Sequence, residues 1–340
     1  MIMKKKILIV LIAITIIIAG LLVFRLKSTT KEEPQGTQLI PSSFEGPRIP
    51  KYIEGGSTIE SQIAREGFSF PDSLPVLRAI PAGPFTQEEV MPFAEKLGFA
   101  SEPIVAEDVS EGTVYIWSNL KDNLVVYSKS RRVEYGLNQT PDNVINKQLS
   151  DEALIKISED FLTKNFLSAA EEISFSFFTF LKSAGLPEGF YQSTKEEASI
   201  YQVNFSPVSS EYKILTLEPG SSPIYVWALP DGTISKAIVN KNLNLAVSGE
   251  KIPLKNYEEF TASLNKAVLV SLDDGNLLLS TLPKSDVQRI VISEAELVYL
   301  MDSSSSESFQ PIFLLKGKAR VKGYDNEVRG LLYLPAFKTP

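Results

Sequence analysis

Three segments of the chain repeat apolar residues every three or four positions, which is the pattern of an amphipathic α-helix. Each segment begins at a residue typical of a helix N-cap and has acidic residues in its first turn; the three N-cap residues are Thr86, Ser150 and Asn256. The apolar faces of the second and third segments comprise Leu154, Ile157, Phe161 and Leu162, and Phe260, Leu264 and Ala267. We expect three helices that bury these faces in the core.

Elsewhere the apolar residues alternate with polar ones, which is typical of β-strands. Residues 113–118 and 124–128 flank a polar loop, and residues 224–230 lead through Asp231-Gly232 into residues 233–239. Asp-Gly between two strand patterns is the strongest short-range signal for a β-hairpin. Further strands are expected at 201–205, 295–300, 312–315 and 331–334. The pattern predicts an α+β fold in which helices cover one face of antiparallel sheets.

The N-terminus contains an uncharged run, residues 7–24, in which fourteen residues are Ile, Leu, Val or Phe. As a helix it would be roughly 27 Å long, enough to cross the hydrocarbon core of a bilayer. A cleaved signal peptide is the main alternative, but the small residues Ala19-Gly20 are followed at once by Leu21 to Phe24. We therefore predict an uncleaved, single-pass transmembrane helix. It would follow a cytoplasmic tail, residues 1–6, and place the C-terminal part outside the cytoplasm.

The residues after this run have the composition of a linker and then of folded modules. Four Pro and four Gly fall within residues 32–56, a density typical of flexible segments. We expect a flexible linker over 25–69, an N-terminal α+β module over 70–148 and a C-terminal region over 149–340. The C-terminal region is long enough for two modules, 149–250 and 251–340.

Composition excludes several kinds of site. The 340 residues include no His and no Cys, so imidazole bases, thiolate nucleophiles, disulfides and the usual zinc or haem sites are excluded. The formal net charge is −7, and from residue 32 onward 28 Lys and Arg face 41 Asp and Glu. Such an acidic surface repels the phosphate backbone, so we expect no nucleic-acid partner, and we assign no cofactor, metal or catalytic residue.

Two patterns could still carry hydrolytic chemistry. Ser-x-x-Lys patterns begin at Ser118, Ser210 and Ser263, among other positions, but the companion motifs of Ser-Lys hydrolases are missing. Carboxylates are plentiful, and Glu294 and Glu296 share one face of a predicted strand. A glycosidase needs two such groups about 5–10 Å apart across a cleft, a distance that spacing along the chain does not fix. A solvated polar face is the default interpretation of this pair.

One aromatic cluster is dense enough to form a contact surface. It comprises Phe175, Phe177, Phe178 and Phe180. If the rings are buried, the cluster is a strand covered on both faces, which burial statistics favour. If they are exposed, it is a surface for a partner. We take these four residues, with Glu294 and Glu296, as the candidate partner contacts.

Several segments resemble known extracytoplasmic proteins. A capped acidic helix followed by residues 224–234 resembles the helix-plus-hairpin unit of PepSY-type domains. Residues 252–260, 292–300 and 310–317 resemble the C-terminal half of YycH/YycI-like proteins, which are single-pass regulators of a cell-wall sensor kinase. The resemblance covers roughly residues 150–337, and residues 70–140 have no counterpart in it. It implies PepSY-like modules of one helix and a sheet, and it carries no catalytic residues.

These observations predict a non-enzymatic, membrane-anchored interaction or regulatory protein. Its membrane contact would be residues 7–24, and its partner would be a protein of the membrane or the cell envelope. Two alternatives stay open: a carboxylate-dependent hydrolase of the cell envelope, and a structural component of an envelope assembly. Two acids with raised pKa values converging in a cleft would favour the hydrolase. A groove without ionisable residues, or an exposed sheet edge, would favour binding.

Overall fold

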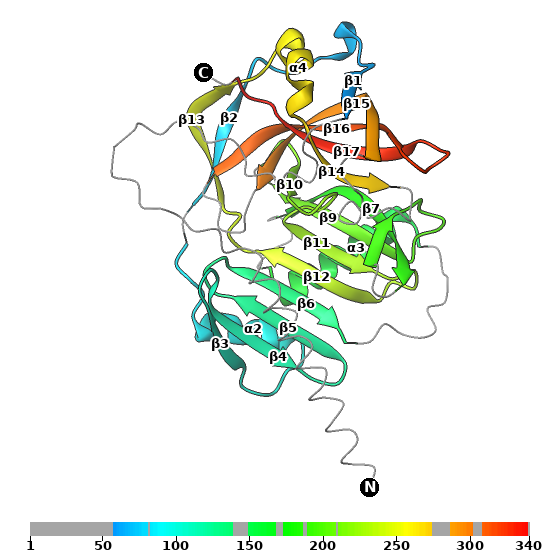
Figure 1. Cartoon of the computed structure of the whole chain (residues 1–340). Helices are drawn as coiled ribbons and strands as arrows, with labels where there is room; N and C mark the ends of the chain where they lie inside the picture. Colours follow the sequence, from blue (N-terminus) through cyan, green and yellow to red (C-terminus); the bar gives the residue numbers. More distant parts are fainter. Residues whose placement is uncertain are drawn as a thin grey trace. The chain divides into compact units, whose positions relative to one another are not determined.

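The computed structural model describes residues 57–80, 82–138, 149–167, 173–185, 189–208, 210–273, 286–301 and 308–338 (Figure 1). The predicted tail 1–6 and the predicted anchor 7–24 lie outside these ranges, and of the predicted linker only residues 57–69 lie within them.

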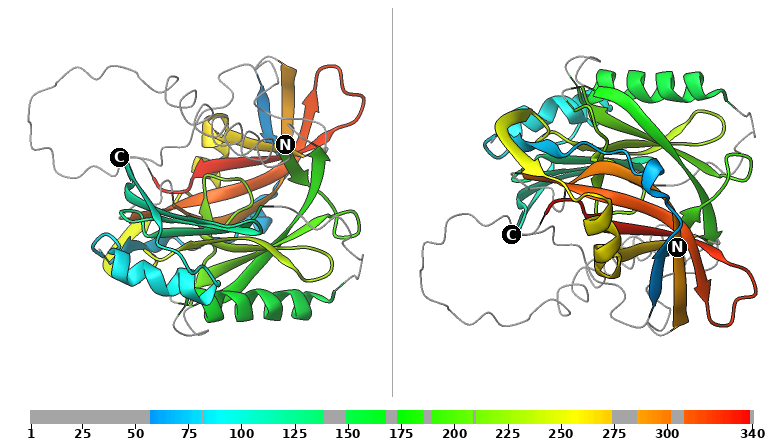
Figure 2. Two further views of the ribbon diagram at one scale, coloured as in Figure 1. Left: turned by 90° about the horizontal axis from the view of Figure 1, so that it is seen from below. Right: turned by 90° about the horizontal axis from the view of Figure 1, so that it is seen from above.

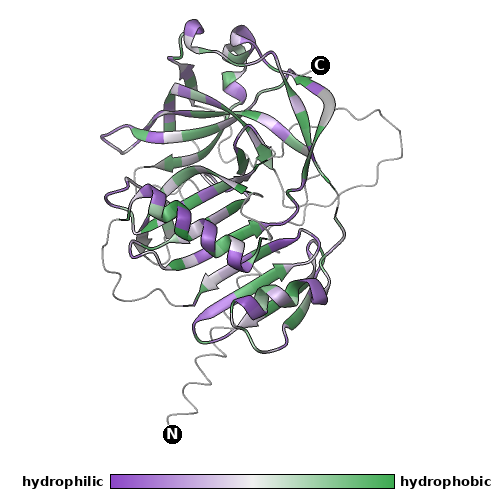
Figure 3. Ribbon diagram, turned by 180° about the vertical axis from the view of Figure 1, so that it is seen from behind, coloured by the Kyte–Doolittle hydropathy of each residue, from purple (hydrophilic) through white to green (hydrophobic). Residues whose placement is uncertain are grey.

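Three α-helices form where the sequence predicts them. They are α2 (Gln87–Lys96), α3 (Asp151–Asn165) and α4 (Tyr257–Ser263). The side chains of Thr86, Ser150 and Asn256 accept hydrogen bonds from backbone N–H groups of the first turns, and the caps of α2 and α4 are complete capping boxes. Hydrophilic and hydrophobic residues alternate along these ribbons in Figure 3, as an amphipathic pattern requires. The three predicted N-caps are confirmed.

A nine-stranded antiparallel sheet carries α2 and α3 on one face (Figure 2). Its strand order is β3 (Ile104–Asp108), β4 (Gly112–Ser118), β5 (Asp122–Tyr127), β6 (Arg132–Leu137), β12 (Ile234–Asn240), β11 (Ile224–Ala228), β9 (Ile200–Pro207), β7 (Ile173–Gly185) and β8 (Gly189–Gln192). The predicted hairpins β4–β5 and β11–β12 are confirmed, and Gly232 in the second turn has φ +89°. The face opposite the helices is called the open face below.

The nine-stranded sheet consists of two similar halves. In each half one helix precedes a four-stranded meander: α2 precedes β3 to β6, and α3 precedes β7, β9, β11 and β12. The last strand of each half, β6 and β12, pair antiparallel from Lys236↔Gly136 to Asn240↔Arg132. We call this pairing the seam. Beneath both helices the core is continuous, and it contains Leu154, Leu162, Val203 and Val226, which are all fully buried.

A second, eight-stranded sheet covers part of the open face. Its main path is β1 (Thr58–Ser61), β15 (Val287–Met301), β16 (Ser308–Val321), β17 (Val328–Pro335) and β14 (Val268–Asp273). The strand β10 (Ile214–Thr216) pairs parallel with β15, while β2 (Ser73–Ala79) pairs with β16 and β13 (Leu245–Pro253). The helix α4 packs Phe260 against Phe68 and Phe313, with ring centroids 4.8 and 5.3 Å apart.

The predicted α+β class is wrong, because the described residues are mostly strand. The patterns seen at 295–300 and 312–315 are only the centres of β15 and β16, which have 15 and 14 residues. Bulges and charged residues interrupt the alternation in these strands, so their ends escape recognition. Eight further strands were not predicted: β1, β2, β3, β6, β8, β10, β13 and β14. The two meanders of the nine-stranded sheet join edge to edge through β6 and β12, so the two halves share one sheet.

The single-pass, signal-anchor interpretation is also corrected. In the part of the chain that the structure describes, no helix is both long and apolar enough to cross a membrane. The longest described helix, α3, has 15 residues and a polar outer face. Residues 7–24, on which the interpretation was based, lie outside the described ranges.

Candidate functional site

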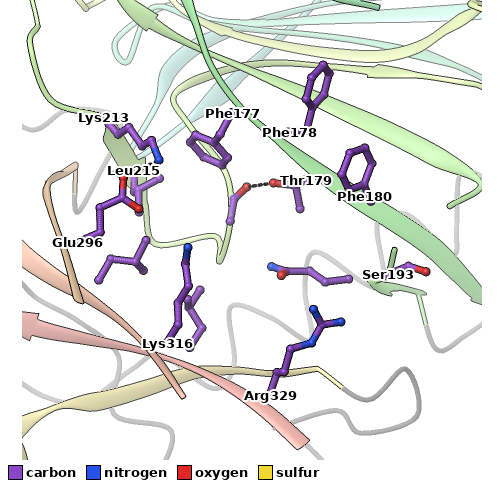
Figure 4. A pocket seen from close by; sticks show the side chains of 14 residues that line it. Phe177, Phe178, Thr179, Phe180, Ser193, Lys213, Leu215, Glu296, Lys316 and Arg329 are labelled. Atoms are coloured by element: carbon purple, nitrogen blue, oxygen red, sulfur yellow. Dashed lines mark hydrogen bonds and ion pairs between the residues drawn. The ribbon is translucent and has the colours of Figure 1, made fainter. Parts of the chain in front are cut away.

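A cavity of about 240 Å³ lies where the two sheets meet. Strands β7 and β8 of the nine-stranded sheet form one side, and β10, β15, β16 and β17 of the eight-stranded sheet form the other (Figure 4). Its charged lining residues are Lys213, Glu296, Lys316 and Arg329. Its other lining residues include Phe177, Thr179, Gln192, Ser193, Leu215 and Leu314. Among the described residues three cations line it against one carboxylate, so we call it the basic cavity.

Lys213 and Glu296 form an ion pair at the wall of the basic cavity. Their Nζ and Oε1 atoms are 2.5 Å apart, and each side chain is about one-third exposed (34 %). Lys213 Nζ also lies 5.3 Å from the ring centroid of Phe177. Because β10 runs parallel to β15, this pair joins neighbouring strands of one sheet. Solvent-accessible ion pairs of this kind contribute little to stability. The main effect of the Lys213–Glu296 pair is therefore to position the Lys213 ammonium group.

A bulge in β15 sets which residues of the eight-stranded sheet face the cavity. The register shifts between Ile292 and Glu294, so that Glu294 pairs with Lys316 and Glu296 with Leu314. Opposite the bulge lies Gly317, where a Cβ atom would meet the carbonyl oxygen of Val291 at 2.2 Å. Glycine is therefore required for the bulge to form. Paired residues share a face, so the bulge places both glutamates on the side of Lys316.

Lys316 and Arg329 come from adjacent strands and lie on one face. Lys316 pairs with Leu331, and Arg329 precedes Leu331 by two residues, so all three side chains point to the same side of the sheet. Lys316 Nζ is 3.8 Å from Glu294 Oε2, and its side chain is about half exposed. A long contact of this kind leaves the ammonium group able to reach a ligand in the cavity.

A buried polar network forms the opposite wall. Thr179 Oγ1 donates to the carbonyl oxygen of Gly220 at 2.6 Å, and Asn204 Nδ2 donates to Thr179 Oγ1 at 3.2 Å. Gln202 Nε2 lies 3.0 Å from Asn204 Oδ1, from the Gly220 carbonyl oxygen and from Ser221 Oγ. Gly220 has φ +70°, and a Cβ atom there would lie 2.7 Å from Gln192 Nε2. These bonds fix the loop after β10 against the open face.

The structure places the predicted phenylalanines on both faces of β7. A register shift between Phe175 and Phe177 puts Phe175, Phe178 and Phe180 opposite Phe205, Val203 and Tyr201, on the helix-covered face. Phe177 pairs with Asn204 and lies on the open face, where its ring contacts the basic cavity. All four side chains are partly exposed, so neither full burial nor a single exposed patch describes them.

The predicted glutamates and Phe177 come together at the cavity. Glu296 lines it and pairs with Lys213, and Glu294 lies at its edge beside Lys316. Phe178 and Phe180 also border it, and Figure 4 shows their rings set apart from Lys316 and Arg329. Phe175 is not among its lining residues.

The three cationic residues of the cavity were not among the site residues predicted from the sequence. Lys316 and Arg329 were detectable in principle, because each interrupts or borders an apolar strand core, Ile312–Leu315 or Leu331–Leu334. Lys213 carried no such signal, since its position depends on the parallel pairing of β10 with β15, about 85 residues away along the chain.

Among the described residues Glu296 is the single acid that lines the basic cavity, and Glu294 lies beside it at the edge, next to Lys316. Backbone hydrogen bonds at helix N-termini lower the carboxyl pKa values of Glu152 and Glu259, and neither residue lines the cavity. Nor does any group of three or more Asp and Glu residues in the described ranges suit a metal ion. Ser263, from one Ser-x-x-Lys pattern, is buried and donates to the Phe260 carbonyl oxygen at 3.0 Å.

Comparisons with known proteins add little to this geometry. No family model matches the chain. No curated protein is significantly similar to it. An uncharacterized protein of known structure from Eubacterium rectale is similar over 84 % of this chain and 88 % of that chain, with 13 % identity and a TM-score of 0.45. A likeness this weak supports no argument about fold or function, so the resemblance to PepSY and YycH/YycI-like proteins stays a prediction.

Proposed function

We propose that residues 57–338 form a non-enzymatic binding domain whose basic cavity takes a small anionic molecule and which regulates a protein partner by contact. The observation that carries the proposal is the convergence of Lys213, Lys316 and Arg329 on one cavity in a chain with a net charge of −7. In a protein of negative net charge, cations that face a single carboxylate form a locally positive site. Such a site favours an anionic ligand over a neutral or cationic one.

The size and lining of the cavity narrow the ligand class. A volume of about 240 Å³ is below the roughly 300–1,000 Å³ typical of drug-sized sites. A phosphate or a short di- or tricarboxylate suits this space. Its oxygens would accept charge-assisted hydrogen bonds from Lys316 and Arg329, and Thr179 and Ser193 line the facing wall. Such a ligand would contact both sheets, so its binding would change the surface that a partner protein contacts.

The proposal includes a location outside the cytoplasm. It is supported by the apolar run at residues 7–24, flanked by Lys and Arg, which is typical of a segment that directs export.

The test is anion binding by the full-length chain. Phosphate, succinate and citrate are screened by thermal shift, with glycerol as a neutral control, and the best anion is then titrated calorimetrically. We expect a rise in melting temperature with the anion, and a loss of affinity of about tenfold or more in Lys316→Gln and Arg329→Gln, because each removes a charge-assisted bond.

Lys318→Gln is the matched control, because Lys318 is an exposed lysine on the same strand and does not line the cavity. Equal losses in Lys316→Gln and Lys318→Gln would mean that only general charge matters. The absence of any anion-dependent shift would refute the proposal.

A further inference from the structure

A second, larger hollow lies on the open face of the nine-stranded sheet. It has a volume of about 730 Å³ and is distinct from the basic cavity, because the two share no lining residue. We call it the aromatic groove, after Trp227 and Phe190 in its wall. Across its floor runs one row of paired residues from β5 to β11: Asn123, Gly136, Lys236 and Trp227.

The groove exists because this row contains a glycine. Gly136 lies between Asn123 and Lys236 and contributes no side chain to the floor. A Cβ atom there would lie 3.2 Å from Asn123 Oδ1. Asn123 Nδ2 donates to Asn138 Oδ1 at 2.8 Å, which holds the amide at the edge of the hollow.

The aromatic wall is fixed before any ligand arrives. Trp227 Nε1 donates to Gln202 Oε1 at 2.7 Å, and Gln202 is only 2 % exposed. Phe190 meets the indole edge to face, with centroids 5.0 Å apart and an interplanar angle of 70°. Lys236 Nζ lies 4.5 Å from the indole centroid. Phe190 itself is 44 % exposed, and an exposed ring held in place offers a flat apolar platform.

The polar lining is balanced in charge, unlike that of the basic cavity. One carboxylate and one ammonium group line the groove, Glu134 and Lys236, and the carboxylate is paired with Arg132 at 3.0 Å. The remaining polar side chains are neutral: Asn123, Ser183, Ser199 and Ser235, with Tyr135 also in the lining. Neutral hydrogen-bonding groups around an aromatic platform suit a ligand that is uncharged, rich in hydroxyl groups and apolar on one face.

We propose that the aromatic groove binds a short neutral saccharide, with one sugar ring against Phe190 and its hydroxyl groups on Asn123, Ser235 and Glu134. The C–H groups of a pyranose form an apolar face that packs on aromatic rings, and its hydroxyls both donate and accept. The volume lies within the roughly 300–1,000 Å³ of typical small-molecule sites and is about three times that of the basic cavity. This inference is independent of the anion proposal.

Tryptophan fluorescence tests the inference directly in the full-length chain. The chain has two tryptophans; Trp117 is 1 % exposed and donates to the Ser101 carbonyl oxygen, so Trp227 is the accessible one. Chitotetraose, cellotetraose and maltotetraose are titrated while emission and acrylamide quenching are recorded. We expect at least one to shift emission and reduce quenching, in the native chain and in Trp117→Phe alike.

Three variants separate binding from folding. Phe190→Ala should weaken saccharide binding at least tenfold, whereas Tyr324→Ala, at an exposed tyrosine outside the groove, should leave it unchanged. Gly136→Val adds a side chain to the floor with a residue that strands accept, and should abolish binding while circular dichroism stays native. Lys316→Gln should bind the saccharide normally, which distinguishes this site from the basic cavity.

No response to any of the three saccharides at millimolar concentration would overturn the inference. So would equal affinity in Phe190→Ala, or a response confined to phosphate or to a peptide of zero net charge such as triglycine. The last outcome would assign the groove to a different class of ligand.

Discussion

Gln202 is the residue on which both hollows depend. Its amide nitrogen serves Asn204, Gly220 and Ser221 on the side of the basic cavity, and its amide oxygen accepts from Trp227 on the side of the aromatic groove. It is nearly fully buried. A buried polar group is favourable only while its hydrogen bonds are made, because desolvation costs more than a single bond returns. Exchange of this one side chain would therefore affect two sites at once.

We predict that Gln202→Leu lowers the free energy of unfolding by about 1–3 kcal/mol, since it removes the acceptor of the Trp227 indole N–H and leaves Thr179 as the remaining side-chain donor to the Gly220 carbonyl oxygen. Urea unfolding followed by circular dichroism measures the loss. Gln87→Leu is the control, because Gln87 is exposed and bonds only Glu102 at the surface; it should change the value by less than about 0.5 kcal/mol. Native-like stability of Gln202→Leu would show that the network is dispensable.

At the scale of the element, β15 and β16 determine which side chains reach the basic cavity. Their bulge depends on the close approach of Gly317 to the Val291 backbone. Gly317 pairs directly with Gly330 on β17. The two glycines differ in surroundings, however. The nearest atom to a Cβ at Gly330 would be Leu269 Cδ1 at 3.5 Å, an ordinary contact with a side chain.

These neighbouring glycines give a matched pair of substitutions. Gly317→Ala should destabilise the protein by about 1–3 kcal/mol, because the backbone of β15 must move away. It should also weaken binding of the anion, because Glu294, Glu296 and Lys316 shift with the bulge. Gly330→Ala should be neutral or slightly stabilising, since alanine restricts the unfolded chain. Chemical denaturation of both variants decides the matter, and equal effects would argue against the role assigned to Gly317.

The elements also show which parts of the fold could be predicted from sequence. The helices could be predicted, because an N-cap such as Asn256 and the apolar residues Phe260 and Leu264 are local signals. The β11–β12 hairpin could also be predicted, because Asp231-Gly232 specifies its own turn. The pairing of β10 with β15 and the seam were not, since they join segments distant in sequence whose register depends on the whole molecule.

The same division applies to the candidate site. Glu294 and Glu296 were correctly placed on one face because strand alternation is local. What alternation could not predict is the bulge after Phe175, which places Phe177 on the face opposite the other three rings, although the rings on both faces are partly buried against the core. Lys213 was missed because the ion pair that defines its role crosses between distant segments.

At the scale of the molecule, buried tyrosines tie neighbouring elements of each sheet together. Tyr299 on β15 donates to the Pro75 carbonyl oxygen of β2 at 2.6 Å, and Tyr333 on β17 donates to that of Thr216 on β10 at 3.2 Å. Tyr135 and Tyr225 donate to Asp122 and Glu218, each at 3.1 Å. Burial raises the pKa of all four phenols above the ordinary tyrosine value of 10.0.

The sign of the resulting pH dependence follows from proton binding. Above about pH 10 the unfolded chain loses these phenolic protons while the folded chain retains them, so the folded state binds more protons and stability falls as pH rises. Below pH 10 the contribution is fully present. We predict cooperative alkaline unfolding that coincides with phenolate absorbance at 295 nm. Tyr333→Phe should reduce the slope of stability against pH above 10, with Tyr324→Phe, at an exposed side chain, as the control. An unchanged slope in Tyr333→Phe would contradict this account.

The aromatic groove lies across the seam between β6 and β12, and this position has a further consequence. Gly136 belongs to one half of the nine-stranded sheet, and Lys236 and Trp227 belong to the other, so the groove straddles the joint. A molecule seated there would touch both halves and resist their separation. Such a molecule would therefore change the mechanical stiffness of the joint. Neither half has this property alone, and it would affect any protein that contacts the sheet.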